Sequence, residues 1–302
     1  MTVREVVTPW AYPERQFTSR ATVSVVIPML NEARNIAEVL PRLPSGIDQV
    51  VLVDGGSTDG TVEAARRLRP DMTIVQQTRR GKGNALACGF AAATGDIIVM
   101  MDADGSTRPE EISSFVETLV QSGADFVKGS RFIPGGGSDD ITSFRRAGNK
   151  ALNWLVNLLC RTRYTDLCYG YNAFWRRCLP AFDLNHGRNE TIPGCAEMQW
   201  GDGFEIETLI NIRVATASLR TVEVPSFESC RLHGRSNLNA FSDGLRVFRT
   251  IFVEWRRRYA SDTETKLEMG AILEFHAPHL DHEAILMGNA ELEYCGVADG
   301  SS

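Results

Sequence analysis

In the stretch VMMDADGST, residues 99–107, an apolar run leads directly into two carboxylates. A buried carboxylate is costly unless a positive charge neutralises it. Asp102 and Asp104 are two residues apart, so on an extended chain they face the same side. Either they form a solvated turn ahead of a helix that begins near residue 109, or they hold a cation. Two hard carboxylates with open coordination positions suit Mg²⁺ or Mn²⁺ carrying a diphosphate.

Strand-like and helix-like patterns alternate on both sides of this stretch. Apolar and β-branched runs predict strands over 23–30, 49–56, 72–77, 96–104 and 125–132. Helical spacing and helix-start residues predict helices between them, over 31–43, 57–68, 81–93 and 109–123. The alternation is typical of an α/β fold with a mostly parallel central sheet and helices on both faces.

Polar residues follow four of the predicted strands, and ligands of such sheets bind beyond the carboxyl ends of the strands. These residues are Asn31, Glu32, Asp54, Lys82, Asp102 and Asp104. Lys82, in RRGKGNAL, is either a cation that approaches a phosphate or a solvated lysine in a basic turn. Asp54 either accepts a hydrogen bond from a base or ribose or caps the helix predicted at 57. The P-loop spacing and the G-x-G-x-x-G pattern after the first strand are both missing from the sequence.

The alternation weakens beyond residue 132. A mobile loop with three consecutive glycines is expected over 133–140. Further helices are predicted over 143–160, 203–219 and 239–258, and further strands over 166–177 and 221–229.

Charge divides the chain unevenly. The 302 residues have a formal net charge of −6, but residues 261–302 contain nine acids and one base. The preceding part is therefore slightly basic, and nothing in it demands a nucleic-acid partner. We expect a polar N-terminal leader over 1–21, one large domain over 22–258 and an acidic tail over 259–302.

Cysteine usage and hydropathy bear on the location of the protein. Seven cysteines without a C-x-x-C pair favour a reduced, cytoplasmic protein. No run reaches the roughly 18–20 apolar residues of a membrane span. The first twenty residues also lack the apolar segment of a signal peptide. We expect a cytoplasmic protein, with any membrane contact peripheral and on the inner face.

The motifs, taken together, resemble family 2 glycosyltransferases of the GT-A fold. VVIPMLNE, VVLVDGGSTDGT, RGKGNAL, MMDADGS and KGSRF occur in the order and spacing of that family. The later segments TDLCYGYNAFWR, GFEIET and VEVPSFESCRLHGRSNLNAF resemble its dolichyl-phosphate mannose synthase branch. The resemblance covers roughly residues 22–258. It implies a metal-dependent transferase that uses a nucleotide-diphosphate sugar.

The resemblance also implies roles for residues of the donor site. Pro28, Asn31, Glu32, Asp54 and Ala103 would hold the nucleotide sugar, with Lys82 near the diphosphate. Asp102 and Asp104 would bind the metal, with Ser106 near it. The sequence departs from the family at Gly55, where many members carry a second aspartate, and this affects recognition of the base.

Three arginines match positions that serve the acceptor in this branch. Arg131 and Arg145 match positions that hold the acceptor phosphate, together with Asn149, which stands where the branch often has serine. Arg231 matches an arginine on a flexible loop over the site. Each arginine alone is more often a surface ion pair, so the acceptor role rests on the resemblance. The residues expected to carry catalysis are Asp102, Asp104, Arg131, Arg145 and Arg231.

The function that the resemblance implies is inverting transfer of a hexose from a GDP- or UDP-sugar to a polyprenyl phosphate, such as dolichyl or undecaprenyl phosphate. A phosphate monoester is already anionic, so cations that position it replace a general base. One alternative is the same donor chemistry with a soluble hydroxyl acceptor, a sugar, cyclitol or natural product. Asp166, Glu205 or Glu207 would then be the base, unless they are buried partners of arginines. Another alternative is a nucleotide-sugar binding protein without turnover.

The helix predicted over 239–258 allows two interpretations. Its apolar residues recur every three or four positions: Phe241, Leu245, Phe248, Phe252 and Trp255. Arginines occupy much of the remainder. The helix could lie on an anionic membrane face, or it could be a core-facing helix with a basic outer side. Further on, His276, His279 and His282 are spaced three apart, but Pro278 interrupts them in a weakly ordered tail, so we expect no metal there.

Overall fold

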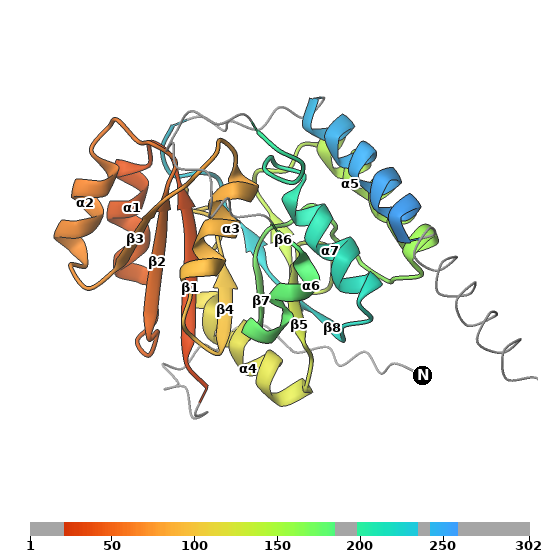
Figure 1. Cartoon of the computed structure of the whole chain (residues 1–302), viewed down its shortest axis with the longest axis horizontal. Coiled ribbons are helices and arrows are strands. Elements are labelled where there is room, and N and C mark those ends of the chain that lie inside the picture. The colour runs from red at the N-terminus through yellow and green to blue at the C-terminus, as the bar shows by residue number, and fades with distance from the viewer. Residues whose placement is uncertain (1–20, 185–197, 235–241, 259–302) are drawn as a thin grey trace, which may run out of the picture. The chain divides into compact units, whose positions relative to one another are not determined.

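Seven strands form the central sheet of the protein (Figure 1). A computed structural model describes residues 21–184, 198–234 and 242–258. The strands are ordered β3-β2-β1-β4-β7-β5-β8 across the sheet. Their bounds are β1 Val23–Met29, β2 Gln49–Asp54, β3 Thr73–Gln76, β4 Ile97–Met100, β5 Phe126–Ser130, β7 Asn172–Trp175 and β8 Thr221–Pro225. β7 runs antiparallel to β4 and β5, and the other neighbouring pairs are parallel.

Helices cover both faces of this sheet, as predicted. They are α1 Ala33–Val39, α2 Thr61–Leu68, α3 Lys82–Ala92, α4 Ile112–Ser122, α5 Ser143–Cys160, α6 Leu179–Phe182 and α7 Ile206–Thr216. Short 3₁₀ turns lie at Leu40–Arg42, Pro109–Glu111 and Arg176–Cys178. A last helix spans residues 242–258. None of the helices in the described ranges is both long and apolar enough to cross a bilayer.

Alternation along the strands divides the core into two layers. Val25 and Ile27 of β1 pack with α1, α2 and α4, whereas Val26 between them packs with α3, α6 and α7. Neighbouring side chains of a strand point to opposite faces, so a continuous apolar strand fills both layers. A third apolar cluster joins α5 and α7 to the last helix through Val156, Ile212 and Ile251.

Three local features differ from the sequence prediction. The strand expected over 96–104 ends at Met100, so Asp102 and Asp104 lie in the turn that follows it. The loop expected over 133–140 contains a short strand, β6 Gly137–Ser138, which pairs with β9 Phe227–Glu228. The strand expected over 166–177 is reduced to β7, which is inserted antiparallel between two strands that come earlier in the chain.

Some predictions fall wholly or partly outside the described ranges. Contacts divide the chain into one unit over Met1–Arg256 and another over Arg257–Ser302, and the fold described above belongs to the first. The leader, except its last residue, the acidic tail and its three histidines lie outside the described residues. The domain boundaries therefore remain predictions. The five cysteines that the structure describes, Cys88, Cys160, Cys168, Cys178 and Cys230, are free thiols.

Candidate active site

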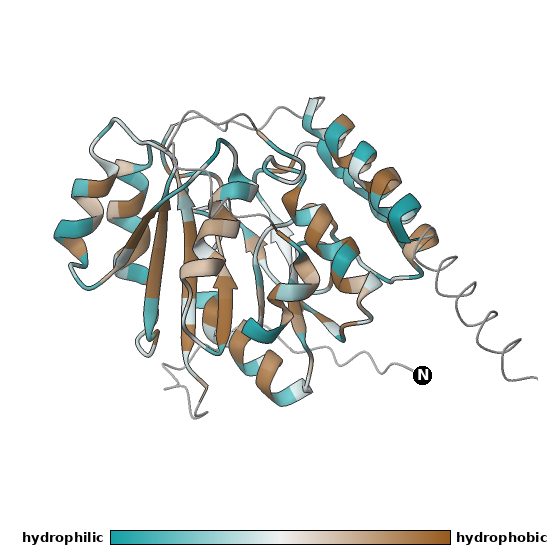
Figure 2. Cartoon of the chain, viewed as in Figure 1, coloured by the Kyte–Doolittle hydropathy of each residue, from teal (hydrophilic) through white to brown (hydrophobic). Residues whose placement is uncertain are grey.

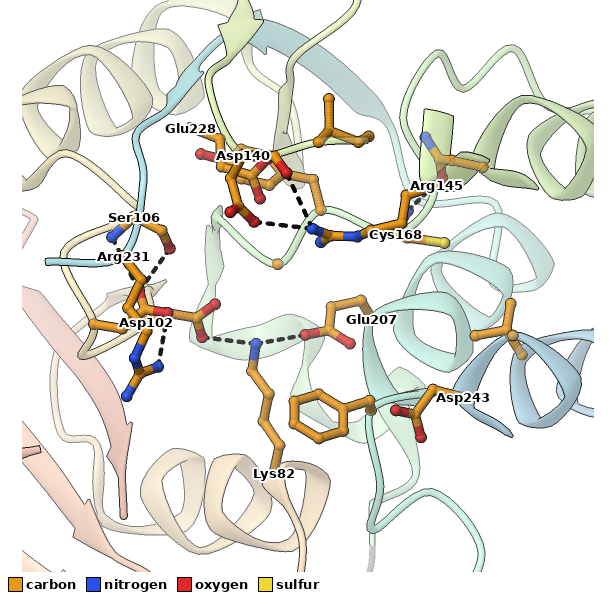
Figure 3. A pocket seen from close by; sticks show the side chains of 18 of the residues that line it. Lys82, Asp102, Ser106, Asp140, Arg145, Cys168, Glu207, Glu228, Arg231 and Asp243 are labelled. Carbon is orange, nitrogen blue, oxygen red and sulfur yellow. Dashed lines mark hydrogen bonds and ion pairs between the residues drawn. The ribbon is translucent and has the colours of Figure 1, made fainter. Parts of the chain in front are cut away.

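A cavity of about 1000 Å³ opens beyond the carboxyl ends of β1 and β4. α5 and the last helix line its other side (Figure 3). All but two of the predicted site residues line this cavity. They are Pro28, Glu32, Lys82, Asp102, Ala103, Asp104, Ser106, Arg131, Arg145, Asn149 and Arg231. The convergence arises because the turns after parallel strands meet at one edge of the sheet.

Lys82 is held at the start of α3 by a close approach of two loops. Gly81 precedes it with φ of 113°, and the Gly83 N–H donates to the Asp202 carbonyl at 2.7 Å. A Cβ at Gly83 would lie 1.8 Å from the Gly201 carbonyl oxygen, so only glycine allows this approach. The two glycines therefore fix the backbone from which the Lys82 side chain enters the cavity.

The ammonium of Lys82 lies between two carboxylates (Figure 3). Its Nζ is 2.6 Å from Asp102 Oδ1 and 2.7 Å from Glu207 Oε1. Burial alone would lower the pKa of Lys82, but the two negative charges raise it well above its ordinary value. Burial raises the pKa of Glu207, and the charge of Lys82 opposes this rise. Sequence analysis considered Glu207 as a general base or as a buried partner of an arginine. The structure instead pairs it with Lys82, the lysine predicted to lie near the diphosphate.

Asp104 lies in the turn after β4 and is paired with Arg231. Its Oδ1 accepts hydrogen bonds from the Ser106 N–H at 3.0 Å and the Ser106 hydroxyl at 2.6 Å. Its Oδ2 lies 3.2 Å from Arg231 Nη1. The same guanidinium bonds to Glu32 and donates to the His233 carbonyl. Burial raises the pKa of Glu32, against the opposing effect of hydrogen bonds from Asn35 and Arg231.

Asp102 and Asp104 have the chemistry that a hard divalent cation requires. Both carboxylates lie on the cavity wall with side chains 31% and 21% exposed. Among the residues that the structure describes, seven acidic and four basic side chains line the cavity, an excess of negative charge. The described part of the chain contains no group of three or more His, Cys, Asp or Glu side chains arranged around one metal position. Two carboxylates leave coordination positions for the oxygens of a diphosphate, as Mg²⁺ prefers.

Arg131 is held by two carboxylates on the side of the cavity formed by β5. Asp166 accepts from its Nε and Nη2 at 2.7 and 2.9 Å, and Glu228 accepts from its Nη1 at 2.9 Å. Burial alone would raise the pKa of Asp166, but the hydrogen bonds and charge of Arg131 lower it below its usual range. The guanidinium also lies 4.8 Å from the centre of the Tyr169 ring. These two carboxylates engage three of its five N–H donors.

Arg145 and Asn149 approach the cavity from α5. Arg145 Nη1 lies 2.9 Å from Asp140 Oδ2 (Figure 3). The Asn149 side-chain amide donates to Asp166 Oδ1 at 2.9 Å, and its oxygen accepts from the Cys168 N–H at 3.2 Å. Asn149 therefore continues the network that positions Arg131.

Asn31 and Asp54 do not line the cavity as the structure describes it. Asn31 has a left-handed backbone with φ of 56°, and its side-chain oxygen accepts from the Thr58 N–H at 2.9 Å. Asp54 is buried and accepts from the N–H groups of Gly56 and Ser57, both at 3.1 Å. Both residues shape the turn after β2. Because α2 begins at Thr61 and no side chain caps it, Asp54 binds N–H groups of this turn and does not cap the helix predicted to begin at 57. Their contact with a nucleotide stays a prediction.

Sequence reasoning missed the acids that hold the arginines. Glu228 lies within the strand predicted over 221–229, and Asp140 is the last residue of the loop predicted over 133–140. Neither was singled out, although Glu228 pairs with Arg131 and Asp140 with Arg145. Asp166 and Glu205 were two of the three acids considered as a general base. Asp166 is fully buried against Arg131, and Glu205 does not line the cavity. The buried-partner alternative therefore fits Asp166.

Three residues of the apolar stripe predicted on the last helix do not face the core, and Phe241 of the same stripe lies outside the described residues. Leu245, Phe248 and Phe252 are 64%, 51% and 49% exposed, whereas Val247 and Ile251 are buried. Apolar and hydrophilic residues alternate along this helix (Figure 2). The core-facing interpretation is therefore wrong for this stripe. Leu245 and Phe248 instead line the cavity.

Comparison with known proteins identifies relatives of the chain. It matches the profile of Glycosyl transferase family 2 over residues 24–179. It is 28% identical over 247 residues to the dolichol-phosphate mannosyltransferase of Pyrococcus furiosus, covering 78% of this chain and 62% of that protein. It is 31% identical over 212 residues to the undecaprenyl-phosphate mannosyltransferase of Micrococcus luteus, covering 67% and 82%. The chain thus spans less than two thirds of the Pyrococcus protein.

A solved structure shares the fold at low sequence identity. It is glucosyl-3-phosphoglycerate synthase from Mycobacterium tuberculosis, in complex with Mn²⁺, uridine diphosphate and glucosyl-3-phosphoglycerate. The TM-score is 0.58 at 23% identity, over 78% of this chain and 80% of that one. This likeness concerns the arrangement of the backbone, which is that of a GT-A glycosyltransferase.

Proposed function

Because the chain belongs to glycosyltransferase family 2, we propose that it transfers a hexose, with inversion, from a GDP- or UDP-sugar to a polyprenyl phosphate. The family makes it a glycosyltransferase, and the donor, metal and acceptor are the proposed part. One observation carries the proposal. A single cavity holds Lys82, Asp102 and Asp104 on one side and two arginines beside an apolar wall on another. Relatives named as polyprenyl-phosphate mannosyltransferases support the same acceptor class.

The donor would bind at the side of the cavity formed by β1, β4 and α3. Asp102 and Asp104 would hold Mg²⁺ or Mn²⁺, with Ser106 fixing the orientation of Asp104. When bound, such an ion neutralises charge that develops on the leaving diphosphate. Lys82 Nζ would donate a hydrogen bond to the same diphosphate. This hydrogen bond would strengthen as the bond to the sugar breaks, because negative charge then builds up on the diphosphate. Pro28, Glu32 and Ala103 would contact the rest of the donor.

The acceptor phosphate would bind at the arginines. Two N–H groups of Arg131 are not engaged by Asp166 and Glu228, and Arg145 lies on the adjacent wall. Arginine suits phosphate because its planar donors pair with two oxygens. A phosphate oxygen would form a bond to the anomeric carbon as the nucleoside diphosphate leaves with the bonding pair. The acceptor enters as an anion, so no base is needed to remove a proton.

The apolar wall beside the arginines suits the polyprenyl chain. Phe144 of α5 and Leu245 and Phe248 of the last helix line the cavity and are 51–71% exposed. Trp154, Leu158 and Phe252 extend this exposed apolar surface along the same two helices. Arg246 and Arg249 lie on the last helix among them. An amphipathic helix with arginines on its polar side binds anionic lipid surfaces, so we propose peripheral contact with a membrane here.

A transfer assay tests the reaction. The purified full chain is given radiolabelled GDP-mannose first, then other GDP- and UDP-hexoses, with Mn²⁺ or Mg²⁺ and undecaprenyl phosphate in detergent. Label that enters the organic phase only with metal is the expected result. Free undecaprenol is the matched acceptor control, because it lacks the phosphate that the arginines would bind. Equal transfer to both lipids would overturn the phosphate as the acceptor group, and nucleotide release without organic label would overturn the lipid acceptor and favour a soluble one.

A sedimentation assay tests the membrane contact separately. Phe248→Ser combined with Phe252→Ser should reduce binding to vesicles that contain anionic phosphatidylglycerol. Leu68→Ser is the matched control, because Leu68 is an apolar residue of α2 that is also exposed, at 42%. Similar binding of both variants would contradict the proposed surface.

A further inference from the structure

We infer that Glu207 is a positioning residue that holds the ammonium of Lys82 at the donor diphosphate and keeps it from pairing with Asp102 alone. The inference deepens the proposed function and rests on it. Glu207 lies in the first turn of α7 and is 5% exposed.

The geometry of Lys82 leaves one donor for a ligand. An ammonium has three N–H groups. Asp102 and Glu207 accept at 2.6 and 2.7 Å, so two of the three are directed at carboxylates, and the third has no acceptor within the described ranges of the chain. Because both carboxylates lie on the cavity wall, the lysine is fixed from two directions (Figure 3). A long flexible side chain that is fixed in this way loses little further freedom when it binds a phosphate.

The residues around Lys82 and Glu207 restrict where these two side chains can lie. A Cβ at Gly170 would lie 2.8 Å from Glu207 Oε1 and 3.3 Å from Lys82 Nζ, so this glycine makes room for both groups. Lys82 also lines a small cavity with Gly81 and Phe204, and among the described residues Asp243 and Arg246 are the other charged ones that line it. Glu207 is the acid in direct contact with Lys82 that has no proposed role with the metal.

The arrangement has a chemical consequence for the metal site. If Glu207 were neutral, Asp102 would be the remaining carboxylate in contact with Lys82. The lysine would then neutralise a carboxylate that the metal needs, and its ammonium would move away from the diphosphate. A second carboxylate in contact with Lys82 therefore helps in two ways: it leaves Asp102 available to the metal, and it keeps the ammonium near the diphosphate.

Nucleotide binding tests the inference, with the β-phosphate as the probe. Affinities for GDP and GMP, and for UDP and UMP, are measured by calorimetry with Mg²⁺ for the wild-type chain and for Glu207→Gln. We expect the preference for the diphosphate over the monophosphate to fall about 10-fold in Glu207→Gln, with monophosphate affinity unchanged. Lys82→Met should cause the same fall. The double variant should show no further loss, because the two residues act as one unit.

A matched variant separates positioning from structural support. Glu254→Gln also removes a buried carboxylate that pairs with α7, through Arg213 at 3.1 Å, but it lies outside the cavity. It should leave the diphosphate preference as in the wild type. If Glu207→Gln lowers diphosphate and monophosphate affinity equally, or lowers neither, the positioning role is wrong. If the wild-type chain binds neither diphosphate, the proposed function itself fails, a result that is visible before any variant is made.

Discussion

The guanidinium of Arg231 bonds to Glu32 and to Asp104 at once, so one side chain from the segment after β9 joins two predicted donor-site residues. The backbone of this segment adds to the contact, because the Leu232 N–H donates to the Asp104 carbonyl at 3.0 Å. The chain therefore provides its own positive charge at the position where a metal ion is proposed.

Arg231→Gln should raise the affinity for Mn²⁺ in the absence of nucleotide several-fold, because it removes a cation that competes for Asp104. Titration of free Mn²⁺ by electron paramagnetic resonance measures this directly. Arg42→Gln is the control, since Arg42 forms an exposed pair with Glu110 at 2.8 Å. Unchanged or weaker Mn²⁺ binding by Arg231→Gln would show that the arginine does not compete with a metal.

Asp166→Asn should lower the free energy of unfolding by about 3–5 kcal/mol, because it leaves Arg131 buried with one counter-charge instead of two. Urea unfolding of the two proteins measures the difference. Asp140→Asn breaks another Asp–Arg pair of the same cavity, but both of its side chains are partly exposed. It should cost less than about 1 kcal/mol. Similar losses for the two variants would contradict the account of the buried network.

Glu111 should make stability fall as pH rises. It is buried, and burial raises its pKa to about 7, against hydrogen bonds from Ser226 and the Phe227 N–H that lower it. The native state therefore holds a proton that the unfolded chain has released above its ordinary pKa of 4.5. The stabilisation is complete below pH 4.5 and is lost as pH passes through 7, by about 3 kcal/mol.

The comparison with Glu111→Gln isolates this residue, because glutamine does not titrate. The difference in free energy of unfolding between the two proteins is measured by urea at pH 5 and pH 8. The wild-type protein should lose stability relative to the variant as pH rises. A difference that stays constant would mean that Glu111 keeps an ordinary pKa.

Gly83→Ala should destabilise the protein by about 1–3 kcal/mol or more, since its Cβ would meet backbone atoms of Gly201 and Asp202 that cannot move independently. The Cβ that Gly148→Ala adds within α5 has no neighbouring atom within 4 Å. This substitution should stabilise the chain by roughly 1 kcal/mol, because alanine has a higher helix propensity than glycine. Thermal unfolding distinguishes the two. Equal melting temperatures would contradict the close approach at Gly83.

Much of the fold follows from local pattern. The first five strands and the helices between them come from apolar runs and helix-start residues, which act over short distances. The rule that parallel strands deliver their ends to one edge then brings Lys82 and Asp102 together. The direction of β7 could not be predicted in this way, because a strand has the same side-chain period whichever way it runs.

Ion pairs between residues far apart in the sequence could not be predicted either. Arg131 and Glu228 are 97 positions apart, and Lys82 and Glu207 are 125 positions apart, so no spacing rule connects them. The last helix illustrates a different limit. Its periodicity predicts an apolar stripe, but the stripe that contacts the core holds Val247 and Ile251 instead. Which face is buried depends on α5 and α7, and these lie elsewhere in the sequence.

The position of β7 determines the order in which a growing chain can assemble. In the described sheet β5 pairs with β7 and β8, both of which follow it in the sequence. On the ribosome, β1 to β4 can associate as soon as residue 100 has emerged, whereas β5 has no partner until residues 172–175 appear. The half of the protein that supplies Asp102 is therefore synthesised and paired first. Arg131, which follows β5, reaches its final place only late in synthesis, when the long-range contacts that slow folding are made.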